Sequence, residues 1–247
     1  DTTATQDADA KDTESVDNQS AAAEATDETM TQNTAGKQEA ENAEELDGWA
    51  TPRSNFARTG SNGDAPTEAV QPAWTYEGNR SLNSSPAVDG TTVYIGDGNE
   101  VIAVDIESGD RLWSNEVDDR IGSSPVVVDG TVYVGSYDPG LHAIDADTGL
   151  TEWEFEPTEG GFSYITSTPT VIDGVVYFGS KNGHVYAVDA ESGEASWSFE
   201  TEDEVSGSPA VVDGTVYVGS QDSYVYAIDA EHGVKEWTFE TQGYNGM

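Results

Sequence analysis

A motif that recurs four times along the chain is the strongest constraint on its fold. In its first copy, AVDIESGDRLW from Ala103 to Trp113, the residues Ala, Asp, Gly and Trp occupy offsets that every later copy keeps, while the residues between them change. Such periodicity indicates a repeated structural unit. The fixed positions are Ala103, Asp105, Gly109, Trp113, Ala143, Asp145, Gly149, Trp153, Ala187, Asp189, Gly193, Trp197, Ala227, Asp229, Gly233 and Trp237.

The repeated unit extends well beyond this motif. Equivalent prolines stand at positions 86, 125, 169 and 209, so the successive steps are 39, 44 and 40 residues. Each unit contains four short β-type segments separated by turn sequences such as Asp-Gly, without helical periodicity. Units of about 40–45 residues with four strands are typical of propeller blades. We therefore predict an all-β propeller with four complete four-stranded antiparallel blades, at about residues 82–117, 121–157, 165–200 and 205–240.

The fixed positions have a physical explanation in such a blade. An Asp that follows the third strand can accept hydrogen bonds from backbone amides of its own turn. The Gly four residues later permits a positive φ or a close approach of another group. Together with the small Ala, this Gly leaves a slot that a Trp can fill between adjacent blades. A buried aromatic side chain removes about 150–250 Å² from water, which gives at most roughly 4–6 kcal/mol. We predict that all sixteen residues are structural docking positions.

The spacing A-x-D-x-x-x-G-x-x-x-W, which all four copies match, resembles the tryptophan-docking motif of the pyrroloquinoline-quinone (PQQ)-like β-propeller repeat family. The segment GWATPRSNFARTGSN at 48–62 is similar to the lead-in to the first blade of that family. The resemblance covers residues 48 to 247 and implies the fold rather than an activity. WD repeats fit less well, because no copy combines their Gly-His pair with their Trp-Asp pair.

The number of strands does not close a ring. Residues 69–78 match the fourth strand of a unit, with Trp74 at the Trp position, but no partner strands precede them. We expect a C-terminally truncated piece of a longer propeller of about seven or eight blades. Closure of four blades alone, or pairing with a second copy, is the alternative.

The first 48 residues differ in composition from the repeats at 49–247. They contain no Phe, Trp or Tyr, and 14 acidic residues against two Lys. Such a segment buries too little apolar surface to offset the entropy of ordering it, so we predict a disordered acidic tail or linker. Because the chain begins at Asp1, we expect either a mature form whose signal was removed or a fragment.

The formal net charge of −39 restricts the partners. An acidic surface repels nucleic acid and anionic lipid. At molar salt the Debye length falls to about 3 Å, which removes most of the self-repulsion. We therefore predict a halophilic source, with an archaeon as the expected organism; an acidic mesophilic protein is the alternative.

The chain has no Cys, which excludes disulfides and thiol nucleophiles. No apolar run reaches the ~20 residues of a membrane span.

The family resemblance implies one enzymatic alternative, a PQQ-dependent quinoprotein alcohol or sugar dehydrogenase. Its members hold the cofactor with calcium on the propeller axis, often beneath a vicinal disulfide, and use a catalytic Asp. Without Cys that disulfide cannot form. The four motif aspartates occur in every unit, whereas a catalytic base would be unique to one blade. We predict no catalytic or cofactor-binding residue, with PQQ and calcium as the alternative.

The histidines show no metal-binding spacing. His142, His184 and His232 fall at three different repeat positions, which indicates surface or strand-filling roles. The turns at 96–100, 136–140, 180–184 and 220–224 are rich in oxygen ligands for calcium, but tight hairpins require the same residues. We predict no metal site.

The longest departure from the repeat, EPTEGGFSYIT at 156–166, contains Phe162 and Tyr164. Exposed, these aromatic residues would be interaction anchors; buried, they would fill the gap left by the longer crossover.

We predict a non-catalytic propeller scaffold that binds a protein or small ligand at the cell surface, attached to the membrane through an N-terminal anchor outside this chain. The resemblance suggests an analogy with propeller lipoproteins that assist outer-membrane protein insertion. An extracellular sensor or carbohydrate-binding ectodomain is a further alternative.

Overall fold

The computed structural model describes residues 72–78, 80, 82, 84–138, 140–158 and 163–242. The predicted tail at 1–48 and the lead-in at 48–62 lie outside these residues. The described residues contain sixteen β-strands and no helix.

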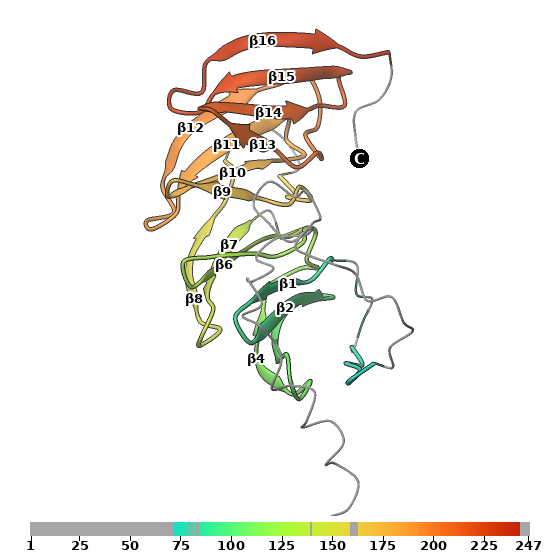
Figure 1. Ribbon diagram of the computed structural model, residues 1–247. Coiled ribbons are helices and arrows are strands. Elements are labelled where there is room, and N and C mark those ends of the chain that lie inside the picture. Colours follow the sequence, from blue (N-terminus) through green and yellow to red (C-terminus); the bar gives the residue numbers. More distant parts are fainter. Residues whose placement is uncertain are drawn as a thin grey trace, which may run out of the picture. The chain divides into compact units, whose positions relative to one another are not determined.

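The strands form four separate antiparallel sheets, each built from four strands that are consecutive in the sequence. Figure 1 shows these sheets in chain order, from the green first sheet to the red fourth. The predicted all-β fold with four four-stranded blades is therefore confirmed. The strands are β1 (Ala87–Asp89), β2 (Thr92–Asp97), β3 (Glu100–Asp105) and β4 (Arg111–Glu116) in blade 1; β5 (Val126–Val128), β6 (Thr131–Gly135), β7 (Leu141–Asp145) and β8 (Thr151–Phe155) in blade 2; β9 (Thr170–Ile172), β10 (Val175–Gly179), β11 (His184–Asp189) and β12 (Ala195–Glu200) in blade 3; and β13 (Ala210–Val212), β14 (Thr215–Gly219), β15 (Tyr224–Asp229) and β16 (Lys235–Glu240) in blade 4.

The Asp-Gly pairs close the first hairpin of blades 2, 3 and 4. Asp173 and Gly174 have φ angles of 51° and 74°, and they connect the register pair Ile172 and Val175. Positive φ at both central residues is the type I′ geometry, whose twist matches that of the flanking strands. Asp129 with Gly130 and Asp213 with Gly214 repeat it. The short polar Asp tolerates this region better than most residues, which explains the recurrence of this dipeptide.

The third and fourth strands of each blade bring the motif Ala and Trp together. Ala187 on β11 is the register partner of Trp197 on β12, and a bulge follows at Val188. The other blades pair their motif Ala and Trp in the same way and have the same register shift. A small residue opposite the indole leaves room for the ring to extend beyond its own sheet.

The hydrophobic cores lie between blades rather than within them. One cluster joins Tyr94 and Val101 of blade 1 to Val132 and Ile144 of blade 2. Two further clusters join blade 2 to blade 3 and blade 3 to blade 4 in the same manner. A four-stranded sheet has two apolar faces, and each becomes buried only against a neighbouring sheet. Blade stability therefore depends on contacts between blades.

The predicted outer strand at 69–78 is described from residue 72 onward, and residues 72–78 belong to no strand. Trp74 and Tyr76 nevertheless pack against Val93, Ile102 and Val104 of blade 1. This segment therefore covers part of one face of blade 1.

Substitution of Gly174 by Ala tests the Asp-Gly turn. A Cβ at this position would meet no atom within 4 Å, so the positive φ is the main penalty. We expect the free energy of unfolding, measured by chemical denaturation, to fall by about 1–2 kcal/mol. Asp173→Gly in the same turn introduces no such strain and is expected to cost clearly less; equal losses in both variants would contradict the turn geometry.

Candidate functional site

The motif aspartates are engaged by their own turns. Asp189 Oδ1 accepts hydrogen bonds from the backbone N of Ser192 at 2.8 Å, the Ser192 hydroxyl at 2.8 Å and the backbone N of Glu191 at 3.2 Å. The residue three positions later makes the equivalent bonds to Asp105, Asp145 and Asp229. Hydrogen bonds to the charged form hold the pKa of each of these carboxyls below its usual range. Each motif aspartate therefore stabilises the turn that follows the third strand of its blade.

The motif tryptophans contact this turn in the following blade. The Trp153 Nε1 donates a hydrogen bond to the carbonyl oxygen of Ala190 at 3.0 Å. Its indole lies so close to Gly193 that an added Cβ would stand 2.7 Å from the ring atom Cδ2. The same pairing of one indole with one carbonyl and one Gly recurs for Trp74 with Ile106 and Gly109, for Trp113 with Ala146 and Gly149, and for Trp197 with Ala230 and Gly233.

A tyrosine on the second strand of blades 1, 2 and 3 supports the same contact. The Tyr133 hydroxyl donates to the Ala190 carbonyl at 3.3 Å, and its ring centroid lies 5.8 Å from that of Trp153. Tyr94 and Tyr177 make the equivalent bonds to the next blade. Burial raises the pKa of all three hydroxyls. Sequence reasoning assigned these tyrosines no role, although their regular spacing was a usable signal.

The fourth copy of the motif differs in its surroundings. Trp237 is 46% exposed and Phe239 is 62% exposed on β16, and the described residues include no blade beyond them. Within its own blade Trp237 still lies beside Tyr217, with ring centroids 5.8 Å apart. Trp237 therefore has the intrablade part of the arrangement but makes no interblade contact within the described residues.

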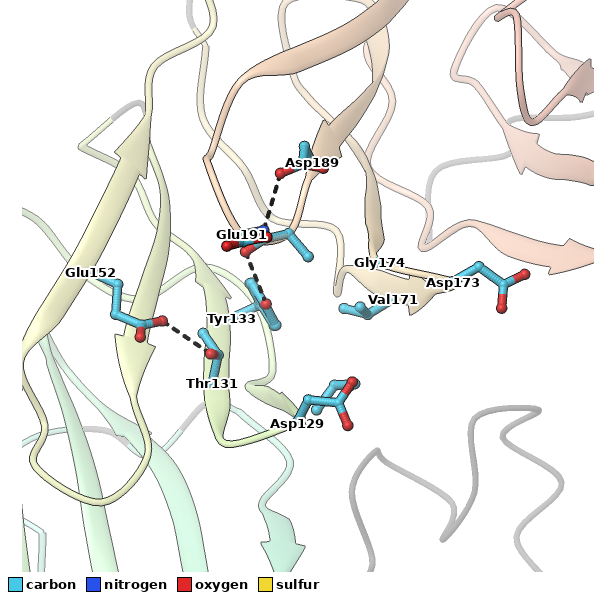
Figure 2. Close-up of a pocket in the computed structure, with 11 residues that line it drawn as sticks. Asp129, Thr131, Tyr133, Glu152, Val171, Asp173, Gly174, Asp189 and Glu191 are labelled. Atoms are coloured by element: carbon cyan, nitrogen blue, oxygen red, sulfur yellow. Dashed lines mark hydrogen bonds between the residues drawn. The ribbon is translucent and has the colours of Figure 1, made fainter.

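Acid-lined grooves open where two blades meet at these turns. Figure 2 shows the groove between blades 2 and 3, which has a volume of about 560 Å³. A similar groove of about 520 Å³ lies between blades 3 and 4. No Lys or Arg is among the described residues that line either groove. Their carboxylates are Asp129, Glu152, Asp173, Asp189 and Glu191 in the first groove, and Asp173, Asp213, Asp229, Glu231 and Glu236 in the second.

The chemistry of the grooves favours cationic occupants. Carboxylates gathered in a concave surface concentrate a negative potential, which attracts basic groups and repels anions. PQQ is itself a polycarboxylate, so the described grooves do not fit this cofactor. No step involving PQQ follows from these residues.

The insertion between blades 2 and 3 is described only in part. Phe162 lies outside the described residues, whereas Tyr164 is half-buried. The Tyr164 ring packs against Tyr137, with centroids 5.2 Å apart, and the Arg120 guanidinium carbon lies 3.7 Å from the Tyr137 ring centroid. Tyr164 thus belongs to a stack of Arg120, Tyr137 and Tyr164 on this part of the surface.

The three histidines lie in different environments. His232 is exposed in a motif turn beside Asp229, and His184 stacks on Tyr186 within β11. The His142 side chain is only 5% exposed and lies among carboxylates. Burial disfavours its charged form, but the hydrogen bond and charge of Asp138, with Glu154, prevail and raise the pKa of His142. Sequence reasoning missed this cluster. His142 and Glu154 both differ from the residues at the equivalent positions of the other repeats, and this difference could have revealed it.

One protein-family model matches most of the chain. The model described as outer membrane protein assembly factor BamB matches residues 64–172 and 159–246. A comparison with curated proteins finds no match. Within the described residues, no helix is long and apolar enough to cross a membrane.

Solved structures show the same fold at low sequence identity. BamB from Moraxella catarrhalis is 24% identical, with a TM-score of 0.63, over 70% of this chain and 56% of its own. Quinohemoprotein alcohol dehydrogenase from Comamonas testosteroni is 20% identical, with a TM-score of 0.64, over 85% and 43%. A europium-containing methanol dehydrogenase is 16% identical, with a TM-score of 0.69, over 78% and 48%. The chain thus spans about half the length of these structures, and the likeness shows the fold alone.

Substitution of Gly193 by Ala tests the interblade indole contact. Gly193 and Gly174 have nearly equal φ angles, 73° and 74°, but only Gly193 lies against an indole. Gly193→Ala adds displacement of Trp153 to the backbone strain, so we expect its loss in free energy of unfolding to exceed that of Gly174→Ala by about 1–3 kcal/mol. Chemical denaturation of both variants measures the difference, and equal losses would contradict a tight contact.

The lowered pKa of Asp189 predicts a specific acid dependence. A carboxyl with a lower pKa in the folded chain than its ordinary value of about 3.9 adds stability above that value and loses this contribution as the pH falls through the folded pKa. We expect Asp189→Asn to be less stable than the wild type near neutral pH, and the two unfolding free energies to converge at low pH.

Unfolding measured from neutral pH down to about pH 2 checks this convergence. Glu191→Gln, in the same turn, removes a charge but keeps the hydrogen bonds of Asp189. It should retain the acid dependence of the wild type. A gap between wild type and Asp189→Asn that stays constant with pH would rule out the assigned role.

Proposed function

This chain belongs to the family of the outer membrane protein assembly factor BamB, with repeats of the PQQ-like kind, and on this premise we propose that it is a non-catalytic scaffold that binds protein partners at the cell surface. The observation that carries the proposal is that the polar groups of the repeated motif form hydrogen bonds within the propeller. The motif carboxylates accept bonds from their own turns, and the indole N–H groups of Trp113, Trp153 and Trp197 donate to the next blade.

The grooves between blades supply the proposed binding surface. They lie beside the docking turns, which hold them in a fixed shape, and Asp173 lines both of them. A partner segment that presents Lys or Arg side chains fits such a surface, because oppositely charged patches guide association. We infer that the partner is a protein with an exposed basic segment.

A quinoprotein dehydrogenase is the competing function, and the fold likeness to the quinohemoprotein alcohol dehydrogenase favours it. Two observations weigh against it for these residues. The grooves are acidic, and the motif aspartates are repeated in all four blades and bound in their turns. Addition of PQQ and calcium with alcohols or sugars and a redox dye is expected to give no turnover; sustained dye reduction would overturn the scaffold proposal.

Binding of a fluorescent Lys- and Arg-rich peptide, measured by anisotropy at fixed salt, tests the binding surface. The triple variant Glu152→Gln, Asp173→Asn and Glu191→Gln removes three groove charges. Because single exposed charges contribute about 0.2–1 kcal/mol each, we expect an affinity loss of roughly tenfold.

A matched triple variant controls for net charge. Glu107→Gln, Asp110→Asn and Glu240→Gln remove the same number of exposed charges at positions that do not line the grooves. This control should retain the affinity of the wild type within about twofold. If both triple variants lose the same amount of peptide affinity, the effect comes from overall charge, and binding in the grooves is refuted.

A further inference from the structure

Blade 2 departs from the repeat at one cross-strand pair. His142 on β7 is the register partner of Glu154 on β8. No other blade has an ionisable pair at this position. The equivalent pairs are Ile102 with Ser114, Tyr186 with Ser198, and Tyr226 with Thr238. The double departure places an imidazole and a carboxylate side by side in this blade alone.

The imidazole is held in one orientation by Asp138. The His142 Nε2 lies 2.9 Å from Asp138 Oδ1. A carboxylate can only accept, so the Nε2–H donates to it. Asp138 is itself fixed, because its Oδ2 accepts a hydrogen bond from the backbone N of Asp118 at 2.9 Å and its Oδ1 contacts the Ser136 hydroxyl. The neutral ring therefore presents the lone pair of Nδ1 on its other side.

The Nδ1 atom has no hydrogen-bond partner although it is buried. It lies 3.5 Å from Glu154 Oε1, beyond a good hydrogen bond. His142 and Glu154 both line a small cavity of about 120 Å³ at the junction of blades 1 and 2. The carboxylates that line the cavity are Glu116, Asp118, Asp138, Glu154 and Glu156, and no Lys or Arg is among its described lining residues. In the neutral ring, the Nδ1 lone pair thus lies beside the Glu154 carboxylate.

This arrangement has the features of a metal-ligating histidine. Such a histidine nearly always donates its second ring N–H to a carboxylate, a backbone carbonyl or water, and His142 donates its own to Asp138. Two ligands bound at about 2.0–2.1 Å to a tetrahedral ion lie roughly 3.4 Å apart, close to the separation of Nδ1 and Oε1. Imidazole and carboxylate together suit first-row divalent ions of the zinc type.

We propose that this cavity binds a divalent transition-metal ion, with His142 Nδ1 and Glu154 as ligands and Asp138 as the positioning residue. The described residues contain no group of three or more His, Asp or Glu side chains ready to hold a metal. The remaining ligands are therefore water or rotated side chains of Glu116 and Glu156. Glu116 ends β4 in blade 1, so an ion that recruits its carboxylate connects two blades. The proposal departs from the expectation that His142 only fills a strand.

Zn²⁺ and Co²⁺ binding to the full chain tests the proposal. Calorimetry with Zn²⁺ near pH 7.5, at a salt concentration that suppresses loose binding to the acidic surface, is expected to show one site tighter than the background. Co²⁺ in this site should give the visible absorption of a low-coordinate nitrogen-ligated ion, and Zn²⁺ should abolish it. Asp138→Asn should weaken Zn²⁺ binding by about 10–100-fold.

The repeat supplies a matched control that is expected to fold. His142→Tyr with Glu154→Ser restores the pair found in blade 3, and it should lose the tight site and the Co²⁺ spectrum while its thermal unfolding remains cooperative. Glu154→Gln, at a more exposed position, gives a second variant with little risk to folding. Equal Zn²⁺ affinity in wild type and double variant, or a Co²⁺ spectrum identical to that of the aqueous ion, would overturn the proposal.

Discussion

The contact on which this fold depends is one indole placed on one glycine of the neighbouring sheet. Each sheet is too thin to bury its own faces, so the cores form only where two sheets meet. At each described junction the Trp Nε1 donates to the carbonyl that follows the motif Asp, and a Tyr hydroxyl donates to the same atom at three of them. One backbone oxygen thereby anchors two aromatic side chains across a junction.

This design separates structural groups from groups available for binding. The turn that receives the indole uses its Asp internally, and the carboxylates around it face the grooves between blades. The grooves are therefore repeated features with the same sign of charge. The proposed binding of a basic partner segment rests on this repeated acidic surface.

Side chains that occur in only one blade are found where the sequence of that blade departs from the repeat. In blade 2 the central strand pair holds His142 and Glu154, where its neighbours hold aromatic or aliphatic residues opposite Ser or Thr. The sheet fixes both backbones, so the two side chains meet without any special loop. The stack of Arg120, Tyr137 and Tyr164 is a second local departure, formed at the junction of blades 2 and 3.

The sequence by itself determined the blades, because strand alternation, Asp-Gly turns and the Ala-Asp-Gly-Trp spacing are local properties of one repeat. It also predicted a turn role for the motif aspartates, which recur in every unit and accept hydrogen bonds from their own turns. Only the tertiary structure decided which groups meet between units, as in the tyrosine bonds to the next blade and the grooves. It also decided which side chains are buried, such as His142 beside Asp138 and Glu154, and which are exposed, such as Trp237. The physical reason is that hydrogen bonds, burial and cavities between sheets depend on the approach of residues about 40 positions apart, for which a single repeat carries no information.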